Sequence, residues 1–218
     1  MEHEFWHQRW QENRIGFHQL QPSPFLIQHF HTLKLASNAR IFVPLSGKTL
    51  DISWLIQQGY RVVAIELSQI AVVALIEQLF EDFKLDFEIS EKNNLIHYAH
   101  PQIDIFVGDF FDLTYKQLGH VDAVYDRAAL VALPADMRKH YTQHLMHITH
   151  TAPQFLVSYE YNQAQFSGPP FSVDSEEIQQ LYGDSYHLQL LAHLAHSEQF
   201  KRTHAQDKIW YLQPKTKA

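Results

Sequence analysis

Residues 40–68 read RIFVPLSGKTLDISWLIQQGYRVVAIELS. Two short apolar runs in this stretch, Arg40–Leu45 and Arg61–Glu66, predict strands, and the segment between them, Thr49–Gln58, predicts a helix that ends at Gly59. Nearly continuous apolar strands are typical of a parallel sheet that is buried on both faces. This strand–helix–strand unit therefore indicates an α/β fold.

The same alternation extends in both directions along the chain. Further strands are predicted at Ile103–Val107, Val121–Tyr125 and Gln154–Tyr159, and helices at residues 4–12, from Pro24 to about Leu35 with Ser23 as N-cap, from Ser68 to about Phe83, at Pro134–Thr149 and at Asp174–Tyr182. The last two strands, Tyr186–Leu194 and Lys208–Gln213, have no helix between them and predict an antiparallel edge hairpin. The pattern predicts a doubly wound, mostly parallel, seven-stranded sheet in a single domain, residues 1–218. Within it, residues 1–35 form an N-terminal cap or lid segment and residues 40–213 the sheet core.

The composition limits the chemistry that the chain can perform. The 218 residues include no cysteine and sixteen histidines, and 45% of them are apolar. The absence of cysteine excludes disulfides, thiolate catalysis, iron–sulfur clusters and cysteine-ligated zinc. The many histidines raise the question of a metal site. A set of three on one predicted helix, His140, His144 and His147, flanks the apolar stripe of that helix without a carboxylate or thiol partner, so we expect no metal.

Charge and hydropathy argue against two classes of partner. The net charge is −7 and no basic run precedes the C-terminal lysines, so no nucleic-acid partner is expected. The chain begins Met-Glu-His-Glu, which is the wrong charge for a signal peptide, and the longest apolar run, Ile70–Ile76, is too short to cross a membrane. We expect a soluble, cytoplasmic protein, and a monomer.

The loop after the first predicted strand excludes three common ligand-binding motifs. Ser46–Thr49 resembles the end of a phosphate-binding loop, but Phe42 stands where that motif needs glycine. Gly47 is alone, so the G-x-G-x-x-G pattern of dinucleotide-binding enzymes is missing. No G-x-S-x-G motif of the α/β-hydrolases occurs.

Acidic residues after the next strands indicate a nucleoside ligand without phosphates. Glu66 ends the second strand 19 residues after Gly47, a spacing that suits a carboxylate that binds ribose hydroxyls. Asp109 follows the third strand and could accept from an adenine amine, while Phe110 could stack on the ring. The alternatives are a surface Glu66 at a strand end and an Asp109 that caps its loop. A ribose carboxylate beside a single-glycine turn suggests S-adenosylmethionine.

At this point the chain resembles the thiopurine S-methyltransferase family, in its bacterial form. The resemblance rests on six motifs in order: residues 6–10 (WHQRW) with Gly16–His18, residues 43–48 (VPLSGK) with Asp51, Trp54, Leu55 and Gly59, residues 63–68 (VAIELS) with Ala71 and Val72, residues 108–113 (GDFFDL), residues 125–134 (YDRAALVALP), and residues 168–173 (GPPFSV). The resemblance implies a class I, Rossmann-like methyltransferase fold, with S-adenosylmethionine as the methyl donor and a small-molecule thiol as the acceptor.

The resemblance also implies roles for individual residues. Those that match the family's cofactor site are Trp10, Leu45, Glu66, Asp109, Phe110 and Arg127. Phe17 matches a residue near the acceptor, and Phe171 lies in a loop that borders the active site, with plain core packing as its alternative. Ser46 stands where the family commonly has cysteine, and no role is transferred to Arg202.

No general base is identified, but Arg127 is expected to favour the thiolate form of the acceptor electrostatically. Its alternative is an ion pair with Asp126 or Asp112. Two alternatives to the function stay open. The same fold could methylate small thiols, halides or reduced selenium and tellurium species, or the chain could be a non-catalytic nucleoside-binding module.

Overall fold

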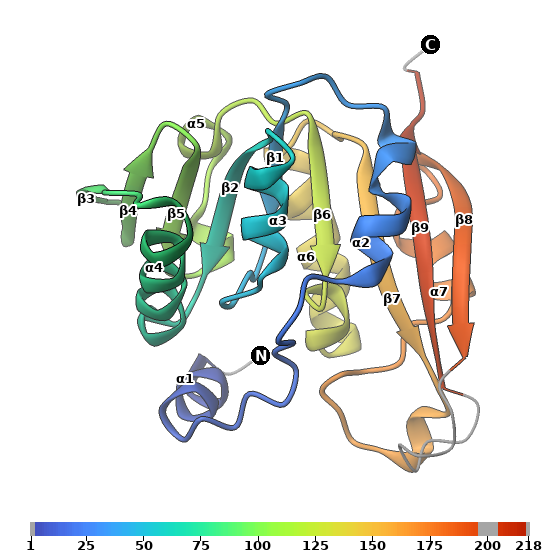
Figure 1. Ribbon diagram of the computed structural model, residues 1–218. Coiled ribbons are helices and arrows are strands. Elements are labelled where there is room, and N and C mark those ends of the chain that lie inside the picture. The colour runs from blue at the N-terminus through green and yellow to red at the C-terminus, as the bar shows by residue number, and fades with distance from the viewer. Residues whose placement is uncertain (1–2, 196–204, 217–218) are drawn as a thin grey trace. The chain divides into compact units, whose positions relative to one another are not determined.

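Strands and helices alternate along the computed structural model, which describes residues 3–195 and 205–216 (Figure 1). Arg202 lies outside the described residues. The helices are α1 (His3–Gln11), α2 (Pro24–His29), α3 (Asp51–Gln57), α4 (Gln69–Phe83), α5 (Tyr115–Leu118), α6 (Ala135–Ile148) and α7 (Ser175–Tyr182), with short 3-10 turns η1 (Phe30–Leu33), η2 (Phe110–Asp112), η3 (Leu130–Ala132) and η4 (Gln163–Gln165). The strands are β1 (Arg40–Val43), β2 (Arg61–Glu66), β3 (Glu88–Lys92), β4 (Leu95–His100), β5 (Ile103–Val107), β6 (Ala123–Arg127), β7 (Gln154–Glu160), β8 (Tyr186–Ala195) and β9 (Gln206–Pro214).

The chain divides into two compact units, Met1–Asp122 and Ala123–Ala218, and each is described by itself. The prediction of a single domain therefore stays a prediction. Among the described residues no helix has the length and hydrophobicity that a bilayer crossing needs.

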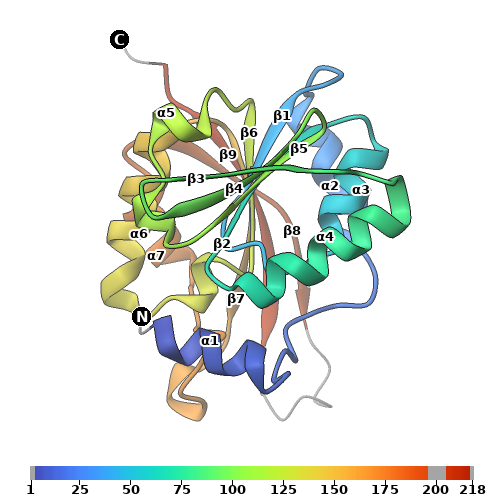
Figure 2. The ribbon, with the colours of Figure 1, turned by 90° about the vertical axis from the view of Figure 1, so that its left-hand side faces the viewer.

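The first unit contains a five-stranded part of the sheet in the order β3-β4-β5-β2-β1. Strands β1, β2 and β5 are parallel, and their carboxyl ends lie at one edge of the sheet. Figure 2 views this sheet from its β3 edge and shows α3 and α4 on one side and α5 on the other. The parallel strands are buried nearly throughout, as their apolar sequences predict.

Strands β3 and β4 were not predicted. They form an antiparallel hairpin that pairs with β5, with Asn93 and Asn94 at its turn. Both asparagines have positive φ angles, 51° and 63°, which is the conformation of a tight type I′ turn. Every residue of β3 is exposed, so the strand has no apolar face, and the Asn-Asn pair is the only local signal for the hairpin.

The second unit contains the order β6-β7-β9-β8, with β6 and β7 parallel and β9 antiparallel to both of its neighbours. The predicted edge hairpin is thus confirmed as β8 and β9. Helices α6 and α7 pack against each other on one side of these strands. Tyr141, Leu145 and Ile148 form the buried stripe of α6, while His140 and His147 are exposed beside it.

One predicted helix start differs in detail. Pro24 opens α2 as expected, but the Ser23 side chain makes no capping hydrogen bond. Instead, the backbone N–H of Ser23 donates to Oδ1 of the buried Asp51 at 2.6 Å. This long-range contact joins the start of α2 to the start of α3.

Candidate functional site

The carboxyl ends of β1, β2 and β5 are the edge where an open parallel sheet binds its ligands. Leu45 and Gly47 lie in the turn after β1, and both have positive φ angles, 46° and 55°. The Ser46 N–H donates to the Ile65 carbonyl at 3.0 Å, so the turn folds back onto β2. Glycine suits position 47 both for this conformation and because an added Cβ would lie only 3.3 Å from the Trp10 ring.

Glu66 connects this turn to the next one. Its Oε2 accepts a hydrogen bond from the Gly47 N–H at 2.8 Å, and its Oε1 accepts one from the Ser68 N–H at 2.8 Å. Glu66 is only 7% exposed. Burial raises the pKa of the Glu66 carboxyl, an effect larger than the lowering by the N–H groups of Ser68, Gly47 and Leu67. The alternative of a surface Glu66 is therefore wrong.

Asp109 lies after β5, at the start of η2. Its Oδ1 accepts from the Phe111 N–H at 2.9 Å, which makes it the cap of its loop, as one of the sequence alternatives had it. Its Oδ2 lies 3.0 Å from Nε2 of His3 in α1. The Asp109 side chain stays 29% exposed, so capping does not remove it from solvent or from a ligand.

Phe110 turns toward the core rather than toward solvent. Phe110 is 6% exposed, and its ring lies nearly parallel to that of Phe42, with the centroids 6.4 Å apart. Stacking of Phe110 on an adenine ring stays a prediction. Gly108, just before it, has a φ of 141°, and an added Cβ would lie 2.5 Å from the Leu95 side chain. This backbone approach is possible only for glycine, and it brings the β4 hairpin against the Asp109 loop.

The N-terminal aromatic residues cluster beside the turn after β1. Trp6 and Trp10 each contact Phe17 edge to face, at 5.7 and 5.6 Å between centroids. Trp10 is buried, whereas Phe17 keeps 37% of its surface exposed. Helix α1 also packs against α4, and both ribbon views show it lying beside the start of that helix. The structure thus brings together the predicted residues Trp10, Phe17, Leu45, Glu66 and Asp109 within the first unit.

The other two predicted residues belong to the second unit. Arg127 is the last residue of β6 and is half-buried. Its neighbour Asp126 is fully buried and accepts from the Tyr141 hydroxyl at 2.7 Å and the Leu130 N–H at 3.2 Å. Burial outweighs these bonds and raises the pKa of Asp126 to about 6.

Phe171 lies in the loop between β7 and α7. Its N–H donates to the Val131 carbonyl at 2.7 Å, and its ring folds back over Gly168, where an added Cβ would lie 2.5 Å away. The Arg138 guanidinium lies 5.9 Å from the ring centroid. The loop is therefore well anchored within its own unit, and the contact of Phe171 with an acceptor stays a prediction.

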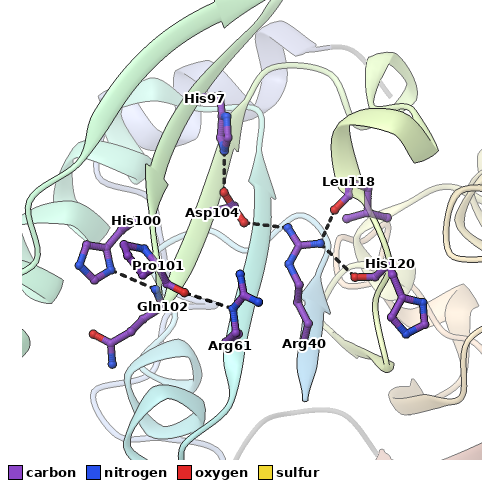
Figure 3. Close-up of polar contacts among 9 residues, drawn as sticks. All are labelled: Arg40, Arg61, His97, His100, Pro101, Gln102, Asp104, Leu118 and His120. Atoms are coloured by element: carbon purple, nitrogen blue, oxygen red, sulfur yellow. Dashed lines mark hydrogen bonds and ion pairs between the residues drawn. The ribbon is translucent and has the colours of Figure 1, made fainter. Parts of the chain in front are cut away.

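The opposite edge of the first sheet carries a second set of charged groups (Figure 3). Asp104 receives Arg40 Nη2 at 2.7 Å and lies 2.8 Å from His97 Nε2, and Arg40 also donates to the carbonyls of Leu118 and His120. Burial raises the pKa of Asp104, but the bonds and charges of His97 and Arg40 lower it more, so the net shift is downward. Arg40 begins β1 and Asp104 lies near the start of β5, so this network belongs to the amino ends of the strands and not to the ligand edge. No group of three metal-ligating side chains occurs within residues 3–195 and 205–216.

Sequence reasoning missed His3 as a neighbour of Asp109 and the backbone bonds that hold Glu66. No local signal marks the first, because the two residues are distant in sequence and meet only when α1 packs onto the sheet. The backbone bonds to Glu66 could have been predicted from the sequence, because a buried carboxylate needs donors and the neighbouring turns supply backbone N–H groups.

A family model and the most similar relatives described here all point to one protein family. Residues 1–215 match the family model described as Thiopurine S-methyltransferase (TPMT). A protein of Acinetobacter baylyi named thiopurine S-methyltransferase is 65% identical over 216 residues, 99% of this chain and 100% of its own length. One from Xanthobacter autotrophicus with the same name is 51% identical over 187 residues, 85% of this chain and 86% of its own.

Solved structures support the fold. A SAM-dependent methyltransferase from Anabaena variabilis superposes with a TM-score of 0.61 at 11% identity, over 98% of this chain and 95% of its own. The N-terminal domain of EvdMO1, solved in the presence of SAH and D-fucose, gives 0.61 at 11% identity over 99% and 98%. The predicted fold class is thereby confirmed, although the described residues form nine strands where seven were predicted. The chain has the fold of S-adenosylmethionine-dependent methyltransferases and belongs to the thiopurine S-methyltransferase family.

Proposed function

We propose that this protein transfers the methyl group of S-adenosyl-L-methionine to the sulfur of thiopurines or other aromatic and heterocyclic thiols. The observation that carries the proposal is the buried Glu66 carboxylate, held by the Gly47 N–H at the ligand edge of the sheet. The names of the relatives that match nearly the whole chain support the acceptor class.

The residues at this edge suit the cofactor. A carboxylate offers about four acceptor positions, and the backbone N–H groups of Gly47, Ser68 and Leu67 leave Glu66 with about one for a ribose hydroxyl. Each oxygen of the Asp109 carboxylate has one partner, the Phe111 N–H or His3, so the group can still accept a hydrogen bond from an adenine amine. Leu45 lies in the turn after β1 and Trp10 lies against Gly47 of that turn, and Phe110 and Arg127 complete the proposed set. When bound, S-adenosylmethionine supplies a methyl group on a sulfonium, which is an already activated leaving group.

The chain's own contribution is to position the acceptor and to keep water away. Correct orientation of two reactants can supply roughly 7–11 kcal/mol of the barrier. Phe17 and Phe171 are proposed as apolar walls for an aromatic acceptor. A thiolate must lose its hydration shell before it can attack, and apolar walls keep water out of the site. Arg127 is proposed to stabilise the thiolate electrostatically.

We also propose that the protein works in the cytoplasm, as a monomer, on a small molecule, and without a nucleic-acid or membrane partner. The net charge of −7 supports the part of this proposal that concerns nucleic acid.

The test combines binding with turnover. S-adenosylmethionine is titrated by calorimetry, and S-adenosylhomocysteine release is then measured with 6-mercaptopurine, small thiols, iodide and selenite. Preferred turnover of 6-mercaptopurine is the expected result. Preferred turnover of the small acceptors would favour the alternative in which the same fold methylates small thiols, halides or metalloids. Cofactor binding without turnover of any acceptor would indicate a nucleoside-binding module.

A further inference from the structure

Helix α1 contacts two of the proposed cofactor loops with one face. His3 and Trp10 lie seven residues apart, which places them about 20° apart around a helix and about 10 Å apart along it. Trp10 lies over Gly47 in the turn after β1, and His3 pairs with Asp109 after β5. The helix therefore bridges the two turns that are proposed to receive the two ends of the adenosine.

The pairing engages the Asp109 carboxylate on both sides. The Phe111 N–H bonds to Oδ1 at 2.9 Å and His3 Nε2 lies 3.0 Å from Oδ2, so the carboxylate plane is held by two partners from different segments. About two acceptor positions stay open, and the side chain is 29% exposed. His3 thus fixes the orientation of the group without using up its capacity to accept.

The contact of His3 with Asp109 contributes little to the stability of the fold. Its side chain is 55% exposed, and ion pairs that are open to solvent contribute little to folding. In a ligand site a rigid acceptor strengthens binding, because a side chain that is already held in place loses little conformational freedom when the ligand binds.

We infer that His3 is a positioning residue for the adenine end of the cofactor. It orients the Asp109 carboxylate and ties the start of α1 to that loop. The inference rests on the proposed function, in which Asp109 accepts from the adenine amine.

The test measures binding of S-adenosylhomocysteine by calorimetry, together with kcat and the KM for S-adenosylmethionine. His3→Ala should raise the Kd and this KM by about 3–10-fold, as expected for one lost charge-assisted contact, with kcat within about twofold of the wild type. His3→Gln keeps an N–H donor and should recover most of the affinity, which a merely structural role would not predict. His120→Ala is the matched control, because His120 is also an exposed histidine beside an aspartate, Asp122, at 3.3 Å.

A double-mutant cycle separates this inference from the proposed function. In the Asp109→Ala background, His3→Ala should have no further effect on the Kd, because the group that it orients is gone. Unchanged or tighter binding by His3→Ala, or an equal loss in both backgrounds, would overturn the positioning role while leaving Asp109 in place. Wild-type protein that does not bind the ligand, or Asp109→Ala that binds as tightly as wild type, would overturn the adenine assignment itself and the inference with it.

Discussion

The Gly47 N–H donates a 2.8 Å hydrogen bond to Oε2 of Glu66, and this bond joins the turns at the ends of two neighbouring parallel strands. Glu66 therefore has two tasks. It shapes the turn after β1 and presents the remaining acceptor capacity of a buried carboxylate to the ligand edge.

Glu66→Gln should impair both tasks. The amide replaces one acceptor oxygen by a donor, which would then face the N–H of Gly47 or of Ser68. We expect the free energy of unfolding to fall by about 1–3 kcal/mol. The Kd for S-adenosylmethionine should rise about 10- to 100-fold because charged hydrogen bonds to ribose are lost. Urea unfolding and calorimetry measure the two effects, and an unchanged Kd would remove Glu66 from the ribose.

Asp104→Asn is a control that should lose a similar amount of stability as Glu66→Gln, but at the amino ends of the strands. The change weakens the pairing with Arg40 and His97, and we expect unfolding to become easier by about 1–3 kcal/mol. The lowered pKa of Asp104 means that its contribution is present above the unfolded pKa and is lost as the pH falls through the folded pKa. Cofactor affinity should not change, and Glu88→Gln on the exposed strand β3 should change neither quantity. A weaker cofactor affinity in Asp104→Asn would show that general destabilisation also explains the Glu66 result.

Arg127→Ala should lower kcat/KM by about 10- to 100-fold for a thiol that is mostly protonated at the assay pH, because a neighbouring guanidinium favours the thiolate. The loss should be smaller for a heterocyclic thiol that is already ionised. Steady-state kinetics with both acceptors measure this difference. Arg61→Ala serves as the control, since Arg61 donates to the Pro101 carbonyl at the amino end of the strands (Figure 3). Equal turnover by Arg127→Ala and wild type would eliminate the proposed role.

Asp126→Asn should change how stability depends on pH. The folded pKa of Asp126, about 6, lies above its ordinary value of 3.8, so its contribution to stability is complete below pH 3.8 and is lost as the pH rises through 6. The asparagine has no charge to bury. Relative to wild type, the variant should therefore gain about 1–2 kcal/mol between pH 5 and pH 7.5.

Chemical denaturation at the two pH values measures this gain. Asp136→Asn, in the exposed first turn of α6, should follow the wild-type profile. A constant difference between Asp126→Asn and wild type across this range would contradict a buried carboxyl that resists ionisation.

The sequence predicted most strands, the order of elements and the residues at the ligand edge, because these depend on local patterns. A buried parallel strand such as Arg61–Glu66 must be apolar along its whole length, and the residue after its end must lie at the ligand edge. The sequence did not predict the β3–β4 hairpin, because the exposed strand β3 has no hydrophobic periodicity.

Tertiary structure alone decided what each site residue touches. The bond from Gly47 to Glu66, the packing of Phe110 on Phe42 and the pairing of His3 with Asp109 each join segments that are separated along the chain. Such contacts depend on how helices and strands pack, and packing is set by the shapes of all the surrounding side chains. Residue type and position along a strand thus identified the candidate acceptors, whereas burial and the donors around each carboxylate determined its ionisation and orientation.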